Sequence, residues 1–264
     1  MTALTVDEIV TRYQQALDEL KSENDDLKLE NTRLNTRIAC IRKKLEDIEE
    51  IAESLDAEVS PEDARRHKRR YNVAPSDTHW IVEYGADRRV LLPGQWGYLP
   101  GGNKPAAGRA RKPLINVRGE QVASGHGFRD AFASRRCVAV IDGFFEWNTQ
   151  RAPFWYHRAD GGLILLAGLF QDTLEGEHDP RFTILTTRPN KLISIIHDRM
   201  PVIIPAARLD DWLTAPPTDA VALIAPAPED ALIATPVSRR VNSVRNDDAA
   251  CLAPPAPDAQ GSLF

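Results

Sequence analysis

Two ionisable side chains stand inside strongly apolar stretches of this sequence. Glu146 belongs to DGFFEW (142–147), and His197 belongs to IIHDRMPVII (195–204). Burial among apolar residues favours the uncharged form of a carboxyl or imidazole group, and the resulting pKa shifts suit general acid or base chemistry. A purely structural interpretation, with His197 paired to Asp198 and Glu146 to an arginine, stays open on composition alone.

A third stretch, LINVRGEQ (114–121), adds groups that can hold a ligand. Asn116 and Arg118 stand two positions apart, so a β-strand places both side chains on the same face. An amide beside a guanidinium can bind a phosphate or a sugar. A fourth polar and aromatic stretch, RYNVAPSD (70–77), stands upstream of these three.

Clusters of basic residues indicate the class of ligand. They are RRHKRR (65–70), RARK (109–112), Arg135-Arg136 and Arg239-Arg240, and all of them follow the acidic residues 1–58, which account for the net charge of −5. A single such cluster is typical of a solvated surface. Several within one region favour a polyanionic partner such as nucleic acid.

Cysteine and histidine spacing gives no sign of a metal. Cys40, Cys137 and Cys251 are isolated and odd in number, and the histidines are scattered. This argues against a disulfide framework and a zinc site, so we expect no metal and no cofactor. The sequence also lacks a run of about 18 apolar residues and a secretory signal, which predicts no membrane partner and a cytoplasmic location.

The first predicted element that could position these residues is a long helix with a heptad pattern of apolar residues. Its a and d positions are Leu17, Leu20, Asn24, Leu27, Asn31, Leu34, Ile38, Ile41, Leu45, Ile48, Ala52 and Leu55. The pattern predicts a coiled-coil dimerisation helix over residues 1–58, and asparagine at two a positions favours a parallel dimer. A long helix packed on its own domain is the alternative.

After this helix the periodicity changes. We expect a basic linker over 59–70 and an α+β domain with a largely antiparallel sheet over 71–250. The predicted strands are a hairpin of HWIVEY with RRVLL, a hairpin of PFWYH with LILLAGLF, one buried strand over 135–147, and RFTILTT (181–187). Short helices are expected at 128–133, 190–196 and 209–213.

Taken together, the chemistry-bearing stretches resemble the SRAP family, the SOS response-associated peptidases or abasic-site processing proteins. The matching motifs are Tyr71 to Pro75, Trp96 to Pro100, Asn116 to Gln121, Arg135 to Trp147, Ala167 to Leu169, His197 to Val202 and Pro236 to Asn242. They follow the family's order over about residues 70–245. The resemblance implies an SRAP-like mixed, largely antiparallel β-sheet or barrel domain, here preceded by the coiled-coil helix.

The resemblance also implies roles for single residues. In the family, a cysteine exposed by removal of the initiator methionine uses its α-amine and thiol to capture the aldehyde of an abasic site in single-stranded DNA. Carried over, Asn116 would hold the ring or its oxyanion, and Glu146 and His197 would transfer protons. The implied DNA-binding residues are Asn72, Pro75, Trp96, Arg118, Arg135, Arg136, Arg199 and Arg239, with Pro75 and Trp96 wedged against the bases and Arg118 on a flanking phosphate.

One departure from the family pattern separates three hypotheses. The chain begins Met1-Thr2-Ala3, without the expected cysteine, while Cys40-Ile41-Arg42 resembles the family's opening C-G-R but falls on the solvent side of the heptad pattern. The first hypothesis is an SRAP-like protein that binds single-stranded or abasic DNA in the damage response or replication, without covalent capture. The second is an active crosslinking, lyase or autopeptidase enzyme, either matured by cleavage before Cys40 or using Glu146 and His197 for weaker strand cleavage at abasic sites. The third is a coiled-coil adaptor with an inactive SRAP scaffold.

Residues 251–264 are expected to form a disordered tail rich in proline and alanine. Its segment Gln260-Gly261-Ser262-Leu263-Phe264 resembles the Q-x-[SD]-L-F peptide by which bacterial proteins bind the replicative sliding clamp. That resemblance implies that Leu263 and Phe264 fill a hydrophobic pocket while the Gln260 amide forms a hydrogen bond at its rim. A frayed end with two exposed apolar side chains is the alternative.

Overall fold

A ring of β-strands forms the centre of the domain. A computed structural model describes residues 37–39, 48–100, 112–123, 127–174 and 176–256. The ring strands are β3 (Thr78–Tyr84), β4 (Arg89–Trp96), β6 (Arg136–Ile141), β9 (Ile164–Gln171) and β10 (Arg181–Thr187). Antiparallel pairing joins β4, β3, β6, β9 and β10 in that order, and a parallel β10–β4 pairing closes the ring. The α+β class and the largely antiparallel sheet are therefore confirmed.

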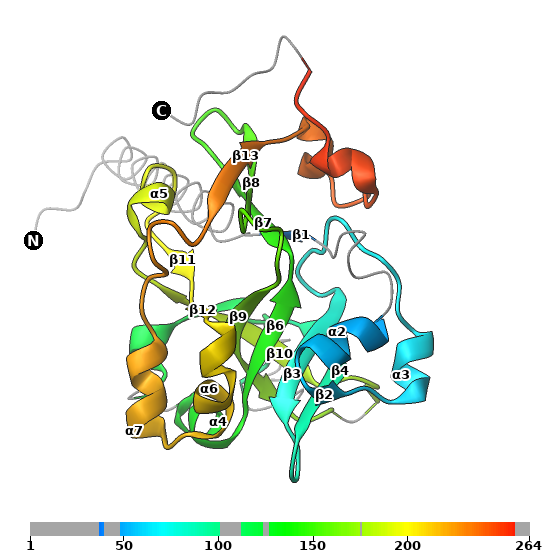
Figure 1. The fold of residues 1–264 in the computed structure, drawn as a ribbon, viewed down its shortest axis with the longest axis vertical. Helices are drawn as coiled ribbons and strands as arrows, with labels where there is room; N and C mark the ends of the chain where they lie inside the picture. The colour runs from blue at the N-terminus through cyan, green and yellow to red at the C-terminus, as the bar shows by residue number, and fades with distance from the viewer. Residues whose placement is uncertain (1–36, 40–47, 101–111, 124–126, 175, 257–264) are drawn as a thin grey trace, which may run out of the picture. The chain divides into compact units, whose positions relative to one another are not determined.

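Short strands and a second sheet are attached to this barrel (Figure 1). Along its edges run β2 (Ala57–Glu58) beside β4, β5 (Asn116–Arg118) and β11 (Met200–Pro201) beside β10, and β12 (Ile203–Ile204) beside β9. The second sheet is antiparallel, in the order β1 (Arg37–Ala39), β7 (Gly143–Trp147), β8 (Pro153–His157) and β13 (Ile233–Pro236).

Short helices connect and cover the strands. The α-helices are α2 (Ile48–Ser54), α3 (Pro61–Arg65), α4 (Arg129–Ser134), α5 (Lys191–Ser194), α6 (Leu209–Thr214) and α7 (Pro217–Ala220). The 3-10 helices are η2 (Gly119–Gln121), η3 (Ala206–Arg208), η4 (Val221–Leu223), η5 (Arg239–Asn242) and η6 (Ala249–Leu252). Helices α4, α5 and α6 confirm the three short helices expected from the sequence. Within the part of the chain that the structure describes, no helix has the length and apolar character needed to cross a bilayer.

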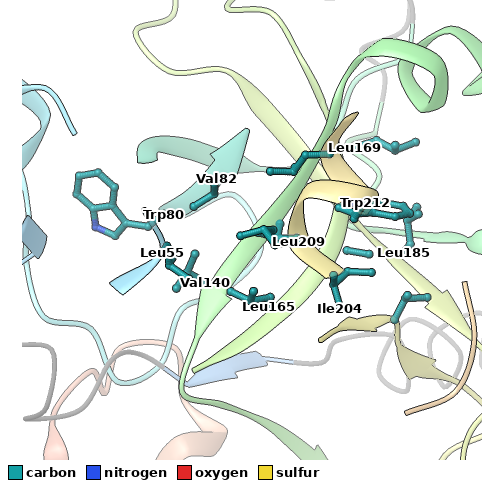
Figure 2. Packing of buried hydrophobic residues seen from close by; sticks show 14 of the residues in the cluster. Leu55, Trp80, Val82, Val140, Leu165, Leu169, Leu185, Ile204, Leu209 and Trp212 are labelled. Atoms are coloured by element: carbon teal, nitrogen blue, oxygen red, sulfur yellow. The ribbon is translucent and has the colours of Figure 1, made fainter. Parts of the chain in front are cut away.

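Two hydrophobic clusters cover the two faces of the barrel. On β6, Val138 and Val140 belong to the outer cluster, together with helices α2, α4, α6 and α7 (Figure 2). The alternate residues Cys137, Ala139 and Ile141 belong to the second cluster. Since the helices pack on the outer face, the second cluster is the interior of the barrel, which Phe144, Phe154 and Tyr156 of the second sheet cap at one end.

The predicted coiled-coil helix does not run through to residue 58. Residues 37–39 form a strand, and α2 begins at Ile48 and ends at Ser54. Ile48, Ala52 and Leu55, which the heptad pattern assigns to a dimer, are instead buried in the outer cluster of this domain. Figure 2 shows Leu55 within this cluster. The spacing i, i+4, i+7 is common to coiled coils and to amphipathic helices on a sheet, so the pattern alone does not separate them. The remaining heptad positions at 17–34 lie outside the described residues.

One predicted hairpin is wrong. PFWYH and LILLAGLF form β8 and β9, which lie in different sheets: β8 pairs with β7 and β13, and β9 pairs with β6, β10 and β12. The predicted single strand over 135–147 is likewise divided at Asp142 into β6 and β7. All these strands are apolar on both faces, so their periodicity does not identify their partners. The β3–β4 hairpin is confirmed.

The predicted basic linker is part of the folded domain, and the tail begins later than predicted. Ser60 caps α3, and Arg66 and Arg70 form ion pairs with Asp179 and Asp247 from distant parts of the domain. At the other end, Cys251 is fully buried in a third cluster with Trp155 and other residues. Contacts of this kind are not visible in local composition. Residues 59–70 and 251–253 therefore belong to the folded domain.

Candidate functional site

Two of the chemistry-bearing stretches pair with β10, one along each of its edges. Strand β5 runs parallel to β10 and places Arg118 beside Thr186. Strand β11 runs antiparallel to it and places Pro201 beside the same Thr186. The 114–121 and 195–204 stretches are thus brought together at the carboxyl end of β10, although they are far apart in the sequence.

Arg199 joins the two stretches. Its Nη1 and Nη2 donate to the Glu120 carboxylate at 2.9 and 2.7 Å, and Nη2 also donates to the Thr186 carbonyl at 2.6 Å. The hydrogen bond from Arg199 lowers the pKa of Glu120. Arg199 was expected to bind DNA directly, but its guanidinium already forms a bidentate pair with a carboxylate. This pair uses both terminal nitrogens that could otherwise donate to a phosphate.

His197 is buried, with 8% of its surface exposed. Its Nδ1 accepts a hydrogen bond from the Arg199 backbone N–H at 2.9 Å, so in the neutral ring the proton is on Nε2. The Asp198 carboxylate lies 3.2 Å from the same Nδ1 and is exposed. The carboxylate is near enough for the predicted pairing, but a ring whose Nδ1 accepts the Arg199 N–H has no proton on Nδ1 to donate to Asp198, so the backbone contact fixes the orientation of the ring for either role.

Glu146 lies on β7 and is only 3% exposed. Because β-strand side chains alternate, it shares a face with Phe144, and its partner on β8 is Phe154. Tyr156 lies on this face too, and burial together with the charge of Glu146 raises the pKa of its hydroxyl. Glu146 thus stands among aromatic side chains at the capped end of the barrel, in the apolar surroundings expected of a proton-transferring carboxyl group.

Asn116 is half-buried at the start of β5, beside Ile184. The preceding residue is anchored by Trp96, whose indole N–H donates to the Ile115 carbonyl at 2.8 Å. Trp96 itself is fully buried in the barrel interior. The expectation that Trp96 wedges against DNA bases is therefore wrong: the indole is enclosed by apolar side chains and positions the strand that carries Asn116.

The three predicted catalytic residues come from elements that line one cluster. Ile184 beside Asn116, Phe144 near Glu146, and Ile193 and Met200 on either side of His197 all belong to the barrel interior. The apolar neighbours of each residue therefore converge, although no two of the three are adjacent in sequence.

Asn72 does not lie on the surface. It is fully buried, and its amide donates to the carbonyls of Val241, Ser243 and Asn246 at 2.9–3.1 Å. The same turn is tied down by Asp247, which accepts from the backbone N–H of Asn72 at 2.9 Å. Its predicted role in DNA binding is wrong, since its donors hold the C-terminal part of the domain.

Arg136 is also buried, with 4% exposed. Its guanidinium donates to the carbonyls of Phe132, Trp212 and Ala215, at the C-terminal ends of α4 and α6. A cation at these helix ends satisfies carbonyls that have no partner within the helix. Arg136 therefore joins two helices to the barrel, and its predicted DNA contact is wrong.

The other predicted DNA-binding residues remain accessible. Arg118 and Arg239 are exposed, Pro75 is half-buried, and Arg135 is half-buried with an ion pair to Asp172 at 3.2 Å. After Pro75 the backbone turns through Ser76, whose φ of 75° lies in the left-handed region. Backbone hydrogen bonds between Ser76 and Trp96 and between Asp77 and Ala74 hold this turn at 2.8 and 3.0 Å.

Sequence reasoning missed Glu120, Thr186 and Tyr156 as parts of the site. Glu120 could have been found, because it stands two residues after Arg118 in the same stretch. Thr186 and Tyr156 lie in apolar strands and have no such signal. Across the described ranges, no group of three or more His, Cys, Asp or Glu side chains is arranged to hold a metal ion. Cys40, Gln260, Leu263 and Phe264 lie outside the described residues.

Comparison with known proteins gives a consistent result. Residues 36–244 match the family model described as SOS response associated peptidase (SRAP). The abasic site processing protein YoqW of Bacillus subtilis is 32% identical over 186 residues, which cover 67% of this chain and 82% of YoqW. The abasic site processing protein YedK of Escherichia coli is 30% identical over 194 residues, covering 70% and 84% of the two chains.

A solved structure agrees with these relatives. A crystal structure of a protein from Bordetella bronchiseptica superimposes with a TM-score of 0.64 at 27% identity, covering 77% of this chain and 99% of the other. The family match begins at residue 36, within the region that the heptad pattern assigned to a coiled coil. Fold, motifs and relatives agree, and the chain belongs to the SRAP family.

Proposed function

We propose that this chain binds abasic sites in single-stranded DNA, in the cytoplasm, during the DNA damage response or replication. The observation that carries the proposal is that the apolar neighbours of Asn116, Glu146 and His197 belong to one cluster, the barrel interior, with the exposed Arg118 on the same strand as Asn116. The relatives YoqW and YedK are named abasic site processing proteins.

Each group has a task that its surroundings support. Arg118 is exposed, so its guanidinium can bind a backbone phosphate. The Asn116 amide, two residues earlier on the same face, would bind the opened sugar of the abasic site. Glu146 and His197 are buried and would hold or transfer protons there.

Two substitutions test this proposal by separating general from abasic binding. Arg118→Ala should weaken binding to a plain strand and to an abasic strand alike, and lower the salt dependence by about 0.7 in log–log slope, because one phosphate contact is lost. Asn116→Ala should remove the preference for the abasic strand. Fluorescence anisotropy at several salt concentrations measures both effects.

Arg129→Ala is the matched control, since Arg129 is an exposed cation on α4 with only a 3.9 Å pair to Asp130. The same affinity and salt slope for the unmutated chain and all three variants would reject DNA binding at this site. It would then favour an adaptor built on an SRAP scaffold.

A second candidate function is covalent capture of the abasic site by Cys40. Two observations favour it: the family match includes residue 40, and residues 37–39, directly before Cys40, form the extended strand β1 and not the helix expected there. Cleavage after Ala39 would give Cys40 a free α-amine. The amine and the aldehyde would lose one water to form an imine, and the thiol would add to its carbon while the thiol proton moves to nitrogen, closing a thiazolidine ring.

Intact mass spectrometry distinguishes the two functions. Covalent capture requires a chain shortened by residues 1–39 and an adduct with abasic single-stranded DNA that Cys40→Ser abolishes. Binding without capture requires an intact chain and no adduct, with affinity for the abasic strand retained. An adduct that survives Cys40→Ser would exclude Cys40 as the nucleophile.

Two protein partners complete the proposal. Residues 260–264 would bind the bacterial sliding clamp, with Leu263 and Phe264 as apolar anchors. A peptide of residues 254–264 should bind purified clamp with micromolar affinity, about −8 kcal/mol, and a Leu263→Ala, Phe264→Ala peptide should not. Equal binding of the two peptides would reject the motif.

The heptad positions at 17–34 would pair two chains in parallel. Light scattering should therefore give a dimer for the full chain and a monomer for Leu27→Pro, because proline breaks the helix. A monomeric unmutated chain would reject this pairing.

A further inference from the structure

A pocket of about 240 Å³ lies between the segment that follows α3 and the beginning of β3. Arg66, His67, Lys68, Arg70, Thr78 and Trp80 line most of it, and none of the described residues that line it is acidic. The pocket is separate from Asn116, Glu146 and His197. Its composition is that of a site for an anion.

Not all of its positive charge is available to a ligand. Arg66 donates to both oxygens of Asp179 at 2.8 and 2.7 Å, and Arg70 pairs with Asp77 at 2.7 Å and with Asp247. Lys68 is exposed and has no ion pair within the described ranges. The ammonium group of Lys68 is therefore the charge that can attract an anion into the pocket.

A neutral donor stands beside this charge. The Trp80 indole N–H donates to His67 Nδ1 at 2.9 Å, which holds the imidazole ring in the wall of the pocket. Thr78 is exposed at the first position of β3, and its hydroxyl makes no hydrogen bond to the part of the chain that is described. An ammonium group and a hydroxyl group are typical donors to phosphate oxygens.

Apolar groups complete the wall. Trp80 and Pro93 line the pocket beside the donors. His79 lines it as well, and burial lowers its pKa to about 4, so it adds no charge at neutral pH. A volume of about 240 Å³ exceeds that of a phosphate ion and leaves room for an attached sugar or base.

We propose that this pocket binds the phosphate group of a nucleotide, with Lys68 and Thr78 on the phosphate and Trp80 and Pro93 against the sugar or base. The nucleotide is either free or part of a DNA strand. Arg70 and Thr78 border the turn that carries Pro75, so a strand bound over that turn would reach the pocket with a neighbouring phosphate. Binding of a phosphate within a DNA strand rests on the proposed function, whereas binding of a free nucleotide does not.

Isothermal titration calorimetry of the full chain with dAMP, inorganic phosphate and deoxyadenosine tests the pocket. We expect dAMP to bind, phosphate to compete with it, and deoxyadenosine to bind at least about tenfold more weakly, because hydrogen bonds to a charged group are lost. Lys68→Ala and Thr78→Val should each weaken dAMP binding, by about tenfold for Lys68. Arg129→Ala should leave it unchanged, and circular dichroism should show that all variants are folded.

Anisotropy with an abasic strand and the same variants separates the two sources. Weaker strand binding by Lys68→Ala and Thr78→Val means that the pocket holds a phosphate of the strand. Unchanged strand binding with weakened dAMP binding means that it takes the free nucleotide. If no strand binds but the dAMP pattern holds, the pocket stands and the proposed function fails. Equal dAMP affinity for the unmutated chain, Lys68→Ala and Thr78→Val overturns the pocket.

Discussion

At the scale of single residues, Tyr156 is in an unusual position. It is fully buried and stacks on Phe144 with ring centroids 5.4 Å apart, yet its hydroxyl has no hydrogen-bond partner within the described ranges. A buried hydroxyl without a partner loses its hydration and gains nothing in exchange. Tyr156 therefore contributes to stability through its ring alone.

Tyr156→Phe should raise the free energy of unfolding by about 1 kcal/mol, because it removes an unsatisfied polar atom and keeps the ring. Urea denaturation measures the change. Tyr84→Phe is the control: its hydroxyl is exposed and donates to the Asp87 carbonyl at 3.1 Å, so its effect should stay within about 0.5 kcal/mol. A destabilised Tyr156→Phe would mean that the hydroxyl has a partner in solution.

Residue types alone did not fully distinguish candidate site residues from residues that support the fold. Glu146 and His197 were expected to be partly buried, and they are buried. Asn72 and Trp96 were expected at a DNA surface, but their amide and indole groups hold backbone carbonyls in the interior. A side chain that satisfies distant carbonyls serves the fold, and the sequence does not show which carbonyls the fold brings near it.

At the scale of elements, the contact between β7 and β8 depends on Gly143. A Cβ atom at this position would lie 2.0 Å from Trp155 Nε1 and 2.6 Å from the Tyr156 carbonyl oxygen. Trp155 is stacked on His157 with ring centroids 3.7 Å apart, so the indole has little freedom to move. Only glycine allows the two strands to approach this closely.

Gly143→Ala should lower the free energy of unfolding by about 3 kcal/mol through overpacking. Gly127→Ala is the matched control, because a Cβ at Gly127 meets no atom of the described residues within 4 Å. Its effect should stay within about 0.5 kcal/mol. Equal unfolding midpoints for the two variants in urea would show that the β7–β8 contact tolerates a side chain.

Local patterns predicted the strands better than their partners. The β3–β4 hairpin follows from two alternating stretches around a short turn, and it is confirmed. For β8 and β9 the same signal was misleading, because β8 leaves the barrel for the second sheet. Which strands meet depends on closure of the barrel by β10, a long-range pairing that no local window contains.

At the scale of the whole domain, stability should depend on pH through His79. Its Nε2 donates to the Val140 carbonyl at 2.7 Å in the interior, and burial lowers its pKa from 6.5 to about 4. Between these values the unfolded chain binds a proton that the folded chain does not bind. His79 therefore leaves the free energy of unfolding unchanged above about pH 6.5, and lowers it progressively as the pH falls toward 4.

The unfolding free energy should fall by roughly 3 kcal/mol from this group over that interval. His79→Gln keeps an N–H donor but does not titrate, so its stability should change less between these pH values than that of the unmutated chain. Urea denaturation at a series of pH values measures both slopes. Parallel slopes would mean that His79 does not dominate the acid sensitivity.

The closure of the ring between β4 and β10 has a consequence for local unfolding. This junction consists of two residue pairs, Gln95 with Arg181 and Trp96 with Phe182, whereas β3 and β4 pair along their whole length. Its amide hydrogens, such as that of Gly97 bonded to the Phe182 carbonyl, should exchange with solvent earlier than those of β6. Since Trp96 anchors Ile115, each opening of the junction would also loosen the hydrogen bond between Trp96 and the segment that leads into Asn116.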